Sequence, residues 1–350
     1  MKAVFFETAS WERRFLASAL ARLRLSIQCI PDPLTEDNLR IASGTEILSV
    51  FIYSRLSASI LRRLPRLRFI ATRSTGFDHI DIATCQKRHI AVSNVPSYGE
   101  NTVAEHTFAL ILALSRNIHK AYIKTMKGDF SLEGLQGFDL KGKTLGVVGS
   151  GHIGLHVIKM AKGFGMDVLV HDIRRDPFLS EVLDFGYASL ESLLRHSDIV
   201  SLHVPYTLAT HHLMNRKTFT LMKRGSLLIN TARGGLIDTD ALVWALDEGI
   251  VSGVGLDVLE GEELVKEEHQ LLSKDFPKEK LATALKNHIL LHRENVVITP
   301  HIAFDSRDAL QRILDTTADN ITDFIKGAPG NVICPASRTA RLVSPIRQTH

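Results

Sequence analysis

The sequence predicts an α/β protein built around a doubly wound parallel sheet of the Rossmann type. Strand-like and helix-like runs alternate through most of the 350 residues, which is typical of parallel sheets covered by helices. The loop at residues 149–154 reads GSGHIG, follows the strand-like run Thr144–Val148 and opens a helix-like run at residues 155–162. The next strand-like run ends in Asp172. A glycine-rich loop between a strand and a helix, with an acid about 20 residues further on, indicates dinucleotide binding.

Each glycine of this loop has a physical role. Gly149 allows the tight turn, Gly151 lets the backbone approach a pyrophosphate, and Gly154 lets the helix pack close to the strand. The N-terminus of the helix then offers free N–H groups and a partial positive charge to the phosphates. The loop is therefore expected to bind the phosphates of a dinucleotide.

The other elements follow in order along the chain. In the first hundred residues we expect strands at residues 3–7, 47–52, 68–72 and 91–94, with a helix at residues 58–64 among those between them. A helix at residues 100–114 has polar residues at its start. Beyond the glycine-rich loop we expect strands at residues 199–203, 227–230, 254–257 and 296–299, and helices at residues 190–196, 216–222, 239–248 and 307–326. This second set completes a doubly wound nucleotide domain.

Composition limits the class of protein. A length of 350 residues suits two domains, and 45% hydrophobic with 23% charged residues is typical of a globular protein. The net charge of +4 is scattered, so no nucleic-acid partner is expected. No apolar run is long enough for a membrane span or a signal peptide. Cys29, Cys85 and Cys334 lie far apart and form neither a metal-binding spacing nor a disulfide framework, which fits a reducing cytoplasm.

Three further segments carry residues suited to chemistry. Arg233, Glu262 and His301 follow predicted strands of the nucleotide domain, and ligands of such sheets bind at the carboxyl ends of the strands. Taken singly, Arg233 could be an ion-paired loop residue and His301 a capped structural histidine. Glu262 could be one acid of a solvated loop, because Glu260 and Glu263 flank it.

Their joint placement beside a dinucleotide suits one reaction. Arginine offers a planar fork to a substrate carboxylate. Histidine exchanges the hydroxyl proton near neutral pH, and a carboxylate behind the imidazole fixes its tautomer and favours its charged form. A nicotinamide cofactor carries the hydride, so no metal is required. We therefore expect a nicotinamide-dependent oxidoreductase acting on a hydroxy acid.

At this point the chain resembles the D-isomer-specific 2-hydroxyacid dehydrogenase family, and within it the D-lactate dehydrogenase-like members. The resemblance runs from about residue 2 to about residue 332. Residues 71–81 (ATRSTGFDHID) are similar to the substrate-domain loop of the family, and residues 94–106 (NVPSYGENTVAEH) to its hinge and interface helix. The segments around Arg233 and His301 are similar to its two catalytic segments.

The resemblance implies roles for the matching positions. Arg233 is expected to bind the substrate and His301 to act as the acid/base. Glu262, 29 positions after Arg233, falls where the family places the partner of its histidine, and we prefer it to Glu260. The implied cofactor-binding residues are Gly149, Gly151, His152, Ile153, Gly154, Asp172, Val204, Pro205, Thr210, Thr231, Ala232, Arg233 and Asp257.

The resemblance also implies a small substrate pocket. The backbone N–H groups of Thr75 and Gly76 would bind the substrate carboxylate, and Tyr53, Tyr98 and Phe304 match aromatic pocket positions of lactate-type members. An aromatic wall leaves room for a small side chain only, which favours pyruvate and D-lactate. The alternative for these three residues is ordinary core packing, because buried aromatic residues are common.

The family's architecture implies a substrate domain that is discontinuous in sequence. Residues 1–100 and 301–335 would form a flavodoxin-like substrate domain, residues 101–300 an inserted NAD-binding Rossmann domain, and residues 336–350 a tail. The helix at residues 101–114 would form the interface of a homodimer.

Several alternatives remain open. Glyoxylate, hydroxypyruvate or a bulkier 2-oxo acid could be the substrate instead of pyruvate. Asp172 favours NAD, although Arg174 and Arg175 follow it and could help the 2′-phosphate of NADP to bind. An NAD-sensing binding protein of the same fold is the alternative from another functional class.

Overall fold

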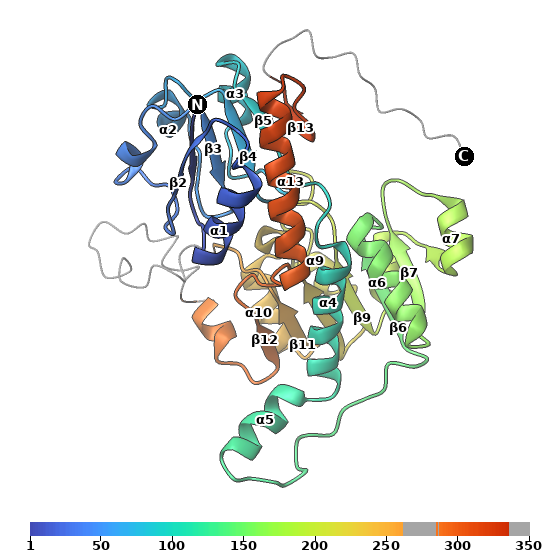
Figure 1. Ribbon diagram of the computed structural model, residues 1–350. Coiled ribbons are helices and arrows are strands. Elements are labelled where there is room, and N and C mark those ends of the chain that lie inside the picture. The colour runs from blue at the N-terminus through green and yellow to red at the C-terminus, as the bar shows by residue number, and fades with distance from the viewer. Residues whose placement is uncertain (262–284, 286, 336–350) are drawn as a thin grey trace. The chain divides into compact units, whose positions relative to one another are not determined.

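The computed structural model describes residues 1–261, 285 and 287–335 (Figure 1). The chain forms two compact units. Met1–Tyr98 and the residues from Ser306 onward make up the first, which we call the terminal unit, and Gly99–Asp305 make up the second, the central unit. The assignment of substrate binding to one of these units and of NAD binding to the other stays a prediction. The predicted tail at residues 336–350 lies outside the described residues.

The terminal unit contains a six-stranded sheet in the order β13-β5-β4-β3-β1-β2. All neighbours are parallel except β13, which runs antiparallel to β5. The order 2-1-3-4-5 of its parallel strands is that of flavodoxin-like folds. The strands are β1 (Lys2–Phe5), β2 (Ser26–Cys29), β3 (Ile47–Val50), β4 (Phe69–Thr72), β5 (Ala91–Ser93) and β13 (Val332–Cys334).

Helices cover both faces of this sheet because its strands are apolar on both sides. In β1, Ala3 and Phe5 join one buried cluster, whereas Val4 joins the other. The first cluster includes residues of α1 (Ser10–Ala19) and α13 (Arg307–Ile325), and the second includes residues of α2 (Ala58–Arg62) and α3 (Ile82–Lys87). The alternation follows from the two-residue period of a strand.

The central unit contains a seven-stranded parallel sheet in the order β12-β11-β10-β9-β6-β7-β8. Counted from β6, this is the doubly wound order 3-2-1-4-5-6 with one further strand, and the order reverses between β6 and β9. The strands are β6 (Thr144–Val148), β7 (Asp167–His171), β8 (Gly186–Tyr187), β9 (Ile199–Leu202), β10 (Ser226–Asn230), β11 (Val251–Leu256) and β12 (Val296–Ile298).

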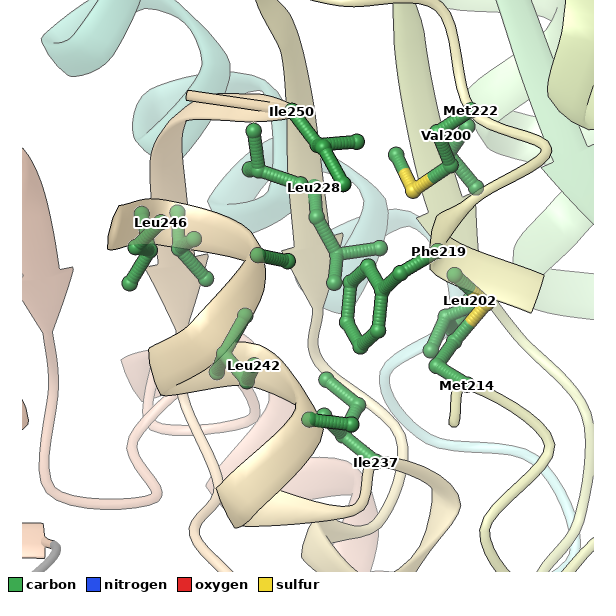
Figure 2. Close-up of a cluster of buried hydrophobic side chains, with 14 of the residues drawn as sticks. Val200, Leu202, Met214, Phe219, Met222, Leu228, Ile237, Leu242, Leu246 and Ile250 are labelled. Carbon is green, nitrogen blue, oxygen red and sulfur yellow. The ribbon is translucent and has the colours of Figure 1, made fainter. Parts of the chain in front are cut away.

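Two layers of helices enclose this sheet. On one face, α8 (Leu190–His196), α9 (Arg216–Phe219) and α10 (Thr239–Asp247) pack on a buried cluster in which Phe219 lies against Leu228 of β10 (Figure 2). On the other face, α4 (Glu100–Ser115) and α6 (His152–Gly163) pack on a second cluster. Two further helices whose bounds are described are α5 (Ile118–Met126) and α7 (Pro177–Leu183). Since the sheet is buried on both faces, the loops at its carboxyl edge are fixed to a rigid support.

No helix in the described part of the chain is both long and apolar enough to cross a lipid bilayer.

His203, directly after β9, makes the central unit sensitive to acid. Its Nε2 lies 2.8 Å from Ser201 Oγ, and burial of the ring lowers its pKa from 6.5 to about 4. Between these two values the unfolded chain binds a proton that the folded chain does not bind, so the stability falls as the pH falls. The loss approaches about 3 kcal/mol at pH 4, because one pKa unit corresponds to about 1.4 kcal/mol.

We expect His203→Gln to remove most of this pH dependence. The measurement is urea unfolding at pH 7 and pH 5 in a Trp11→Phe background, in which Trp244 of α10 reports on the central unit. The parent should lose about 2 kcal/mol more than His203→Gln between the two pH values. An equal loss in both proteins would contradict the assignment.

Candidate active site

The glycine-rich loop connects β6 to α6. Gly149 has φ +101°, and a Cβ atom there would come within 2.7 Å of His203 O. A Cβ atom on Gly154 would lie 2.0 Å from Gly149 O, so the helix can approach the loop only if this residue is glycine. A Cβ atom on Gly151, which precedes α6, would meet no atom within 4 Å. His152 and Ile153 form the first turn of α6. The loop and helix thus provide open space and helix N–H groups, which fit a dinucleotide phosphate.

Asp172 follows β7, and its carboxylate is hydrogen-bonded to Ser150 of the glycine-rich loop. Its Oδ2 accepts hydrogen bonds from Ser150 N at 2.7 Å and Ser150 Oγ at 2.9 Å, and its Oδ1 accepts one from Arg174 N at 2.8 Å. Burial raises the pKa of this carboxyl, but these hydrogen bonds outweigh burial, and the pKa lies below its ordinary value. The charged carboxylate therefore holds the glycine-rich loop against the end of β7, and contact of Asp172 with a ribose stays a prediction.

The predicted residues after β9 border this loop. Val204 and Pro205 follow His203, and Val204 Cγ1 would lie 2.9 Å from a Cβ atom on Gly149. Thr210 Oγ1 donates to Pro205 O at 2.7 Å and accepts from Thr207 N at 2.8 Å. The Thr210 hydroxyl thus stabilises the fold of its own loop, and contact with a cofactor stays a prediction.

Arg233 lies in a loop that the buried Asn230 shapes. Asn230 Nδ2 donates to Arg233 O at 2.9 Å, and Asn230 Oδ1 accepts from Ala232 N at 3.0 Å. Arg233 Nη1 donates to Ala232 O at 2.7 Å. Thr231 Oγ1 lies 3.0 Å from Thr107 Oγ1 of α4. The loop after β10 is therefore fixed to its own strand and to α4.

Asp257, which follows β11, organises the loop that carries His301. Its buried carboxylate accepts hydrogen bonds from Thr299 Oγ1 at 2.5 Å and from Ile302 N and Ala303 N, each at 2.9 Å. His301 N donates to Asp257 O at 2.9 Å, and His301 has φ +58°, in the left-handed region. The carboxylate thus fixes a backbone conformation that is uncommon for residues other than glycine. The expectation that Asp257 also lines the nicotinamide position stays a prediction.

Residues of α4 contact the loops that carry Arg233 and His301, and the sequence did not predict these contacts. His106 Nε2 lies 3.0 Å from Thr299 Oγ1 and 3.5 Å from Asp257 Oδ1. One signal was present, because the polar residues Glu105, His106 and Thr107 come directly before the apolar run at residues 108–114. Phe304, from the same loop as His301, places its ring 6.4 Å from the His301 ring in an edge-to-face arrangement.

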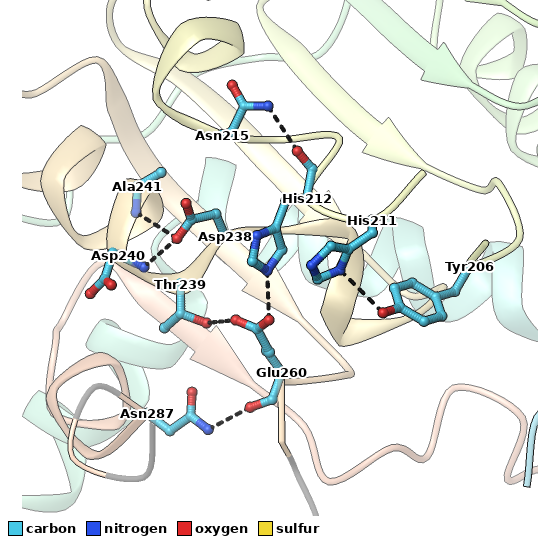
Figure 3. Close-up of polar contacts among 10 residues, drawn as sticks. All are labelled: Tyr206, His211, His212, Asn215, Asp238, Thr239, Asp240, Ala241, Glu260 and Asn287. Atoms are coloured by element: carbon cyan, nitrogen blue, oxygen red, sulfur yellow. Dashed lines mark hydrogen bonds and ion pairs between the residues drawn. The ribbon is translucent and has the colours of Figure 1, made fainter. Parts of the chain in front are cut away.

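The two candidate partners of the histidine have different outcomes. Glu262 lies outside the described residues. The carboxylate of Glu260 is described, and both of its oxygen atoms are engaged (Figure 3). Its Oε1 lies 2.6 Å from His212 Nε2, and its Oε2 accepts from Thr239 Oγ1 at 2.9 Å. The preference for Glu262 over Glu260 as the partner of His301 stays a prediction.

The other predicted substrate residues lie in the terminal unit, in loops after its parallel strands. Tyr53 is 44% exposed, and its N–H donates to Glu7 Oε1 at 2.8 Å. Thr75 Oγ1 donates to Val95 O at 2.8 Å. Gly76 and Tyr98 lie in the loops after β4 and β5. Because these residues and His301 belong to different units, their common pocket stays a prediction.

A buried arginine that the sequence reasoning missed supports these loops. Arg73 is 1% exposed, and its Nη2 donates to Phe6 O and Glu7 O, both at 2.7 Å, while its Nη1 donates to Ser49 Oγ at 3.1 Å. Glu7 has φ +57°, and its carboxylate accepts from the N–H groups of Phe51 and Tyr53. Arg73 therefore fixes the backbone of the residue that holds the Tyr53 loop.

The doubly wound sheet, the glycine-rich loop and the polar residues at its carboxyl edge define a dinucleotide-binding enzyme domain. Residues 108–303 match the family described as D-isomer specific 2-hydroxyacid dehydrogenase, NAD binding domain. The chain belongs to this family and is an NAD-dependent D-2-hydroxyacid dehydrogenase.

Relatives and solved structures cover nearly the whole chain. The D-lactate dehydrogenase of Escherichia coli (strain K12) is 34% identical over 332 residues, which cover 93% of this chain and 98% of that protein. A glyoxylate reductase of Thermococcus litoralis is 36% identical over 296 residues, covering 82% and 83%. The structure of D-lactate dehydrogenase from Aquifex aeolicus, complexed with NAD and lactic acid, has a TM-score of 0.86 and 38% identity, covering 96% and 100%. These similarities confirm the predicted family, fold class and cofactor.

Proposed function

We propose that this enzyme is a D-lactate dehydrogenase that reduces pyruvate with NADH. The observation that carries the proposal is the similarity over 96% of the chain to a D-lactate dehydrogenase complexed with NAD and lactic acid. The edge-to-face contact between Phe304 and His301 supports it, since a bulky ring beside the predicted acid/base favours a substrate with a small side chain.

The chain's own residues divide the chemistry among them. Arg233 binds the carboxylate of the 2-oxo acid and polarises its carbonyl group. His301 donates a proton to the carbonyl oxygen, and Glu262 stabilises the protonated imidazole. Thr75 and Gly76 bind the substrate carboxylate through backbone N–H groups, and Tyr53, Tyr98 and Phe304 limit the size of the substrate. When bound, NADH supplies the hydride.

The glycine-rich loop and Asp172 bind the cofactor in this proposal. Gly149, Gly151, His152, Ile153 and Gly154 surround the pyrophosphate, while Asp172 binds the adenosine ribose and repels a 2′-phosphate. The Arg175 guanidinium lies 5.8 Å from the centre of the Tyr187 ring. The residues assigned to the adenine and nicotinamide positions are Val204, Pro205, Thr210, Thr231, Ala232 and Asp257.

We also propose that the enzyme is a homodimer, and its expected interface at residues 101–114, which lie in α4, stays a prediction. The central unit carries α5, which extends from the end of α4 away from the sheet in Figure 1. Large apolar side chains on α5 and in the segment after it are exposed, and such surfaces support association with a second copy of the chain. These residues are Ile118, Tyr122, Ile123, Met126, Phe130 and Leu132.

A second candidate substrate is glyoxylate, because a glyoxylate reductase covers 82% of this chain at 36% identity. Compared with pyruvate, glyoxylate lacks a methyl group. A hydrophobic pocket distinguishes such substrates by about 1–3 kcal/mol, so rates with both acids are expected.

The deciding experiment measures NADH oxidation with pyruvate, glyoxylate, hydroxypyruvate, phenylpyruvate and 2-oxoisocaproate. We expect the highest kcat/KM with pyruvate, a D-configured product, and a lower kcat/KM with NADPH because of Asp172. A preference for a larger acid would refute the size limit assigned to Tyr98 and Phe304. NADH binding without turnover of any acid would favour a binding protein.

A further inference from the structure

Glu260 bonds to three other segments of the central unit, two through its side chain and one through its backbone carbonyl (Figure 3). Its Oε1 lies 2.6 Å from His212 Nε2 in the loop after β9, and its Oε2 accepts from Thr239 Oγ1 at the start of α10. Its backbone carbonyl accepts from Nδ2 of the buried Asn287 at 2.9 Å. The side chains of His212 and Glu260 are 33% and 28% exposed, so both are largely shielded from water. Neither residue has a role in the reaction described above.

The backbone around this pair encloses the residues that follow Arg233. A Cβ atom on Gly234 would lie 2.1 Å from Leu259 C and 2.4 Å from Glu260 N. His212 N donates to Gly235 O at 2.9 Å. The peptide before Glu260 therefore covers one side of the arginine loop, and the His212 backbone is hydrogen-bonded to it.

His212 is itself held in an uncommon conformation. Its φ of +50° lies in the left-handed region, and Asn215 Nδ2 donates to its carbonyl at 2.9 Å. The His211 ring stacks on the His212 ring at 3.8 Å, and His211 Nδ1 lies 3.1 Å from Tyr206 Oη. A left-handed conformation at a residue other than glycine persists only where its surroundings fix it. The bond to Glu260 is one of these constraints.

We propose that Glu260 and His212 form a positioning pair that holds the Arg233 loop in the geometry needed to bind the substrate carboxylate. The pair touches neither substrate nor cofactor and acts through the backbone of residues 233–235. This inference rests on the role proposed for Arg233. It assigns Glu260 a task different from that of Glu262, although the two acids are only two positions apart.

The test is a double-mutant cycle between Glu260→Ala and Arg233→Lys, with KM for the 2-oxo acid as the readout. We expect Glu260→Ala to raise KM about tenfold in the parent, with an unchanged Kd for NADH. In the Arg233→Lys background the same change should raise KM less than about twofold, because coupled residues are not additive. Glu260→Gln, whose amide can still form hydrogen bonds with His212 and Thr239, should keep KM close to the parent value.

Two results would overturn the proposal. An equal rise in KM in both backgrounds would show that Glu260 does not act through Arg233 and would overturn the proposal. A lower Tm with KM unchanged would assign the pair a purely structural role and would also overturn it. The cycle uses whichever acid the substrate panel selects, so a failure of the pyruvate assignment does not decide this test.

A matched control lies at the other end of α10. Asp247 ends this helix and forms an ion pair with Arg293 at 2.7 Å, with no bond to the arginine loop. Asp247→Asn should leave KM within about twofold of the parent. His212→Asn, which tolerates the left-handed backbone at this position but is too short to reach Glu260 Oε1, should reproduce the rise in KM seen with Glu260→Ala, and an unchanged KM in this variant would contradict the pair.

Discussion

Replacement of His301 by alanine is expected to lower kcat/KM for the 2-oxo acid by about 100- to 10,000-fold, the usual contribution of a positioned acid/base. The Kd for NADH should stay unchanged, because the glycine-rich loop and Asp172 belong to other segments of the central unit. The measurement combines steady-state kinetics with fluorescence titration of NADH. Added imidazole should restore part of the activity.

The backbone at His301 requires a second variant. With φ +58°, an alanine at this position is strained, and the strain alone could displace the loop. Asparagine tolerates the left-handed region better, so His301→Asn preserves the loop while removing the acid/base. Both variants should lose activity to a similar extent. Near-normal kcat/KM in His301→Asn would refute the role of His301.

The surface histidine His119 provides the control. It lies on α5, where its Nε2 is 2.8 Å from Glu294 O, and it has no place in the proposed chemistry. His119→Ala should therefore keep kcat/KM within about twofold of the parent. A comparable loss in His119→Ala would show that the assay reports on general damage to the central unit.

The sequence predicted most of the fold because the elements have strong local signals. Buried parallel strands such as β9 and β10 are continuous apolar runs, and the glycine-rich loop marks the turn between β6 and α6. Three strands in the described part of the chain were not predicted. β2 is an edge strand with every second residue exposed, β8 has two residues, and β13 joins the terminal sheet as a short antiparallel strand. Their pairing depends on the rest of the fold and leaves little pattern in the sequence.

The candidate site divides in the same way. Arg233 and His301 were predictable because they follow strands at the edge where ligands of such sheets bind. The contacts that fix the loops of Arg233 and His301 were not predictable from the sequence. His106 meets Thr299 across 193 positions of sequence, and His212 meets Glu260 across 48. No periodic pattern marks such pairs, because tertiary packing alone brings them together.

Replacement of Arg233 by lysine is expected to raise KM for the 2-oxo acid by about 10- to 100-fold. A guanidinium can bind a carboxylate with two parallel hydrogen bonds, whereas an ammonium group acts as a point charge. The loss of one charge-assisted hydrogen bond is worth about 1.5–3 kcal/mol, and each 1.4 kcal/mol corresponds to a factor of about ten. The loop itself should persist, because Asn230 holds it through the backbone of Ala232 and Arg233.

The split between the kinetic constants then identifies what Arg233 does. Because Arg233 is proposed to polarise the carbonyl group as well as to bind the carboxylate, kcat should fall together with the rise in KM, since this interaction strengthens in the transition state. A kcat near the parent value would limit the role of Arg233 to binding the carboxylate. Arg216→Lys is the control, since the Arg216 guanidinium packs on the Trp244 ring at 5.0 Å in the same unit. A KM for Arg233→Lys equal to that of Arg216→Lys would refute substrate binding by Arg233.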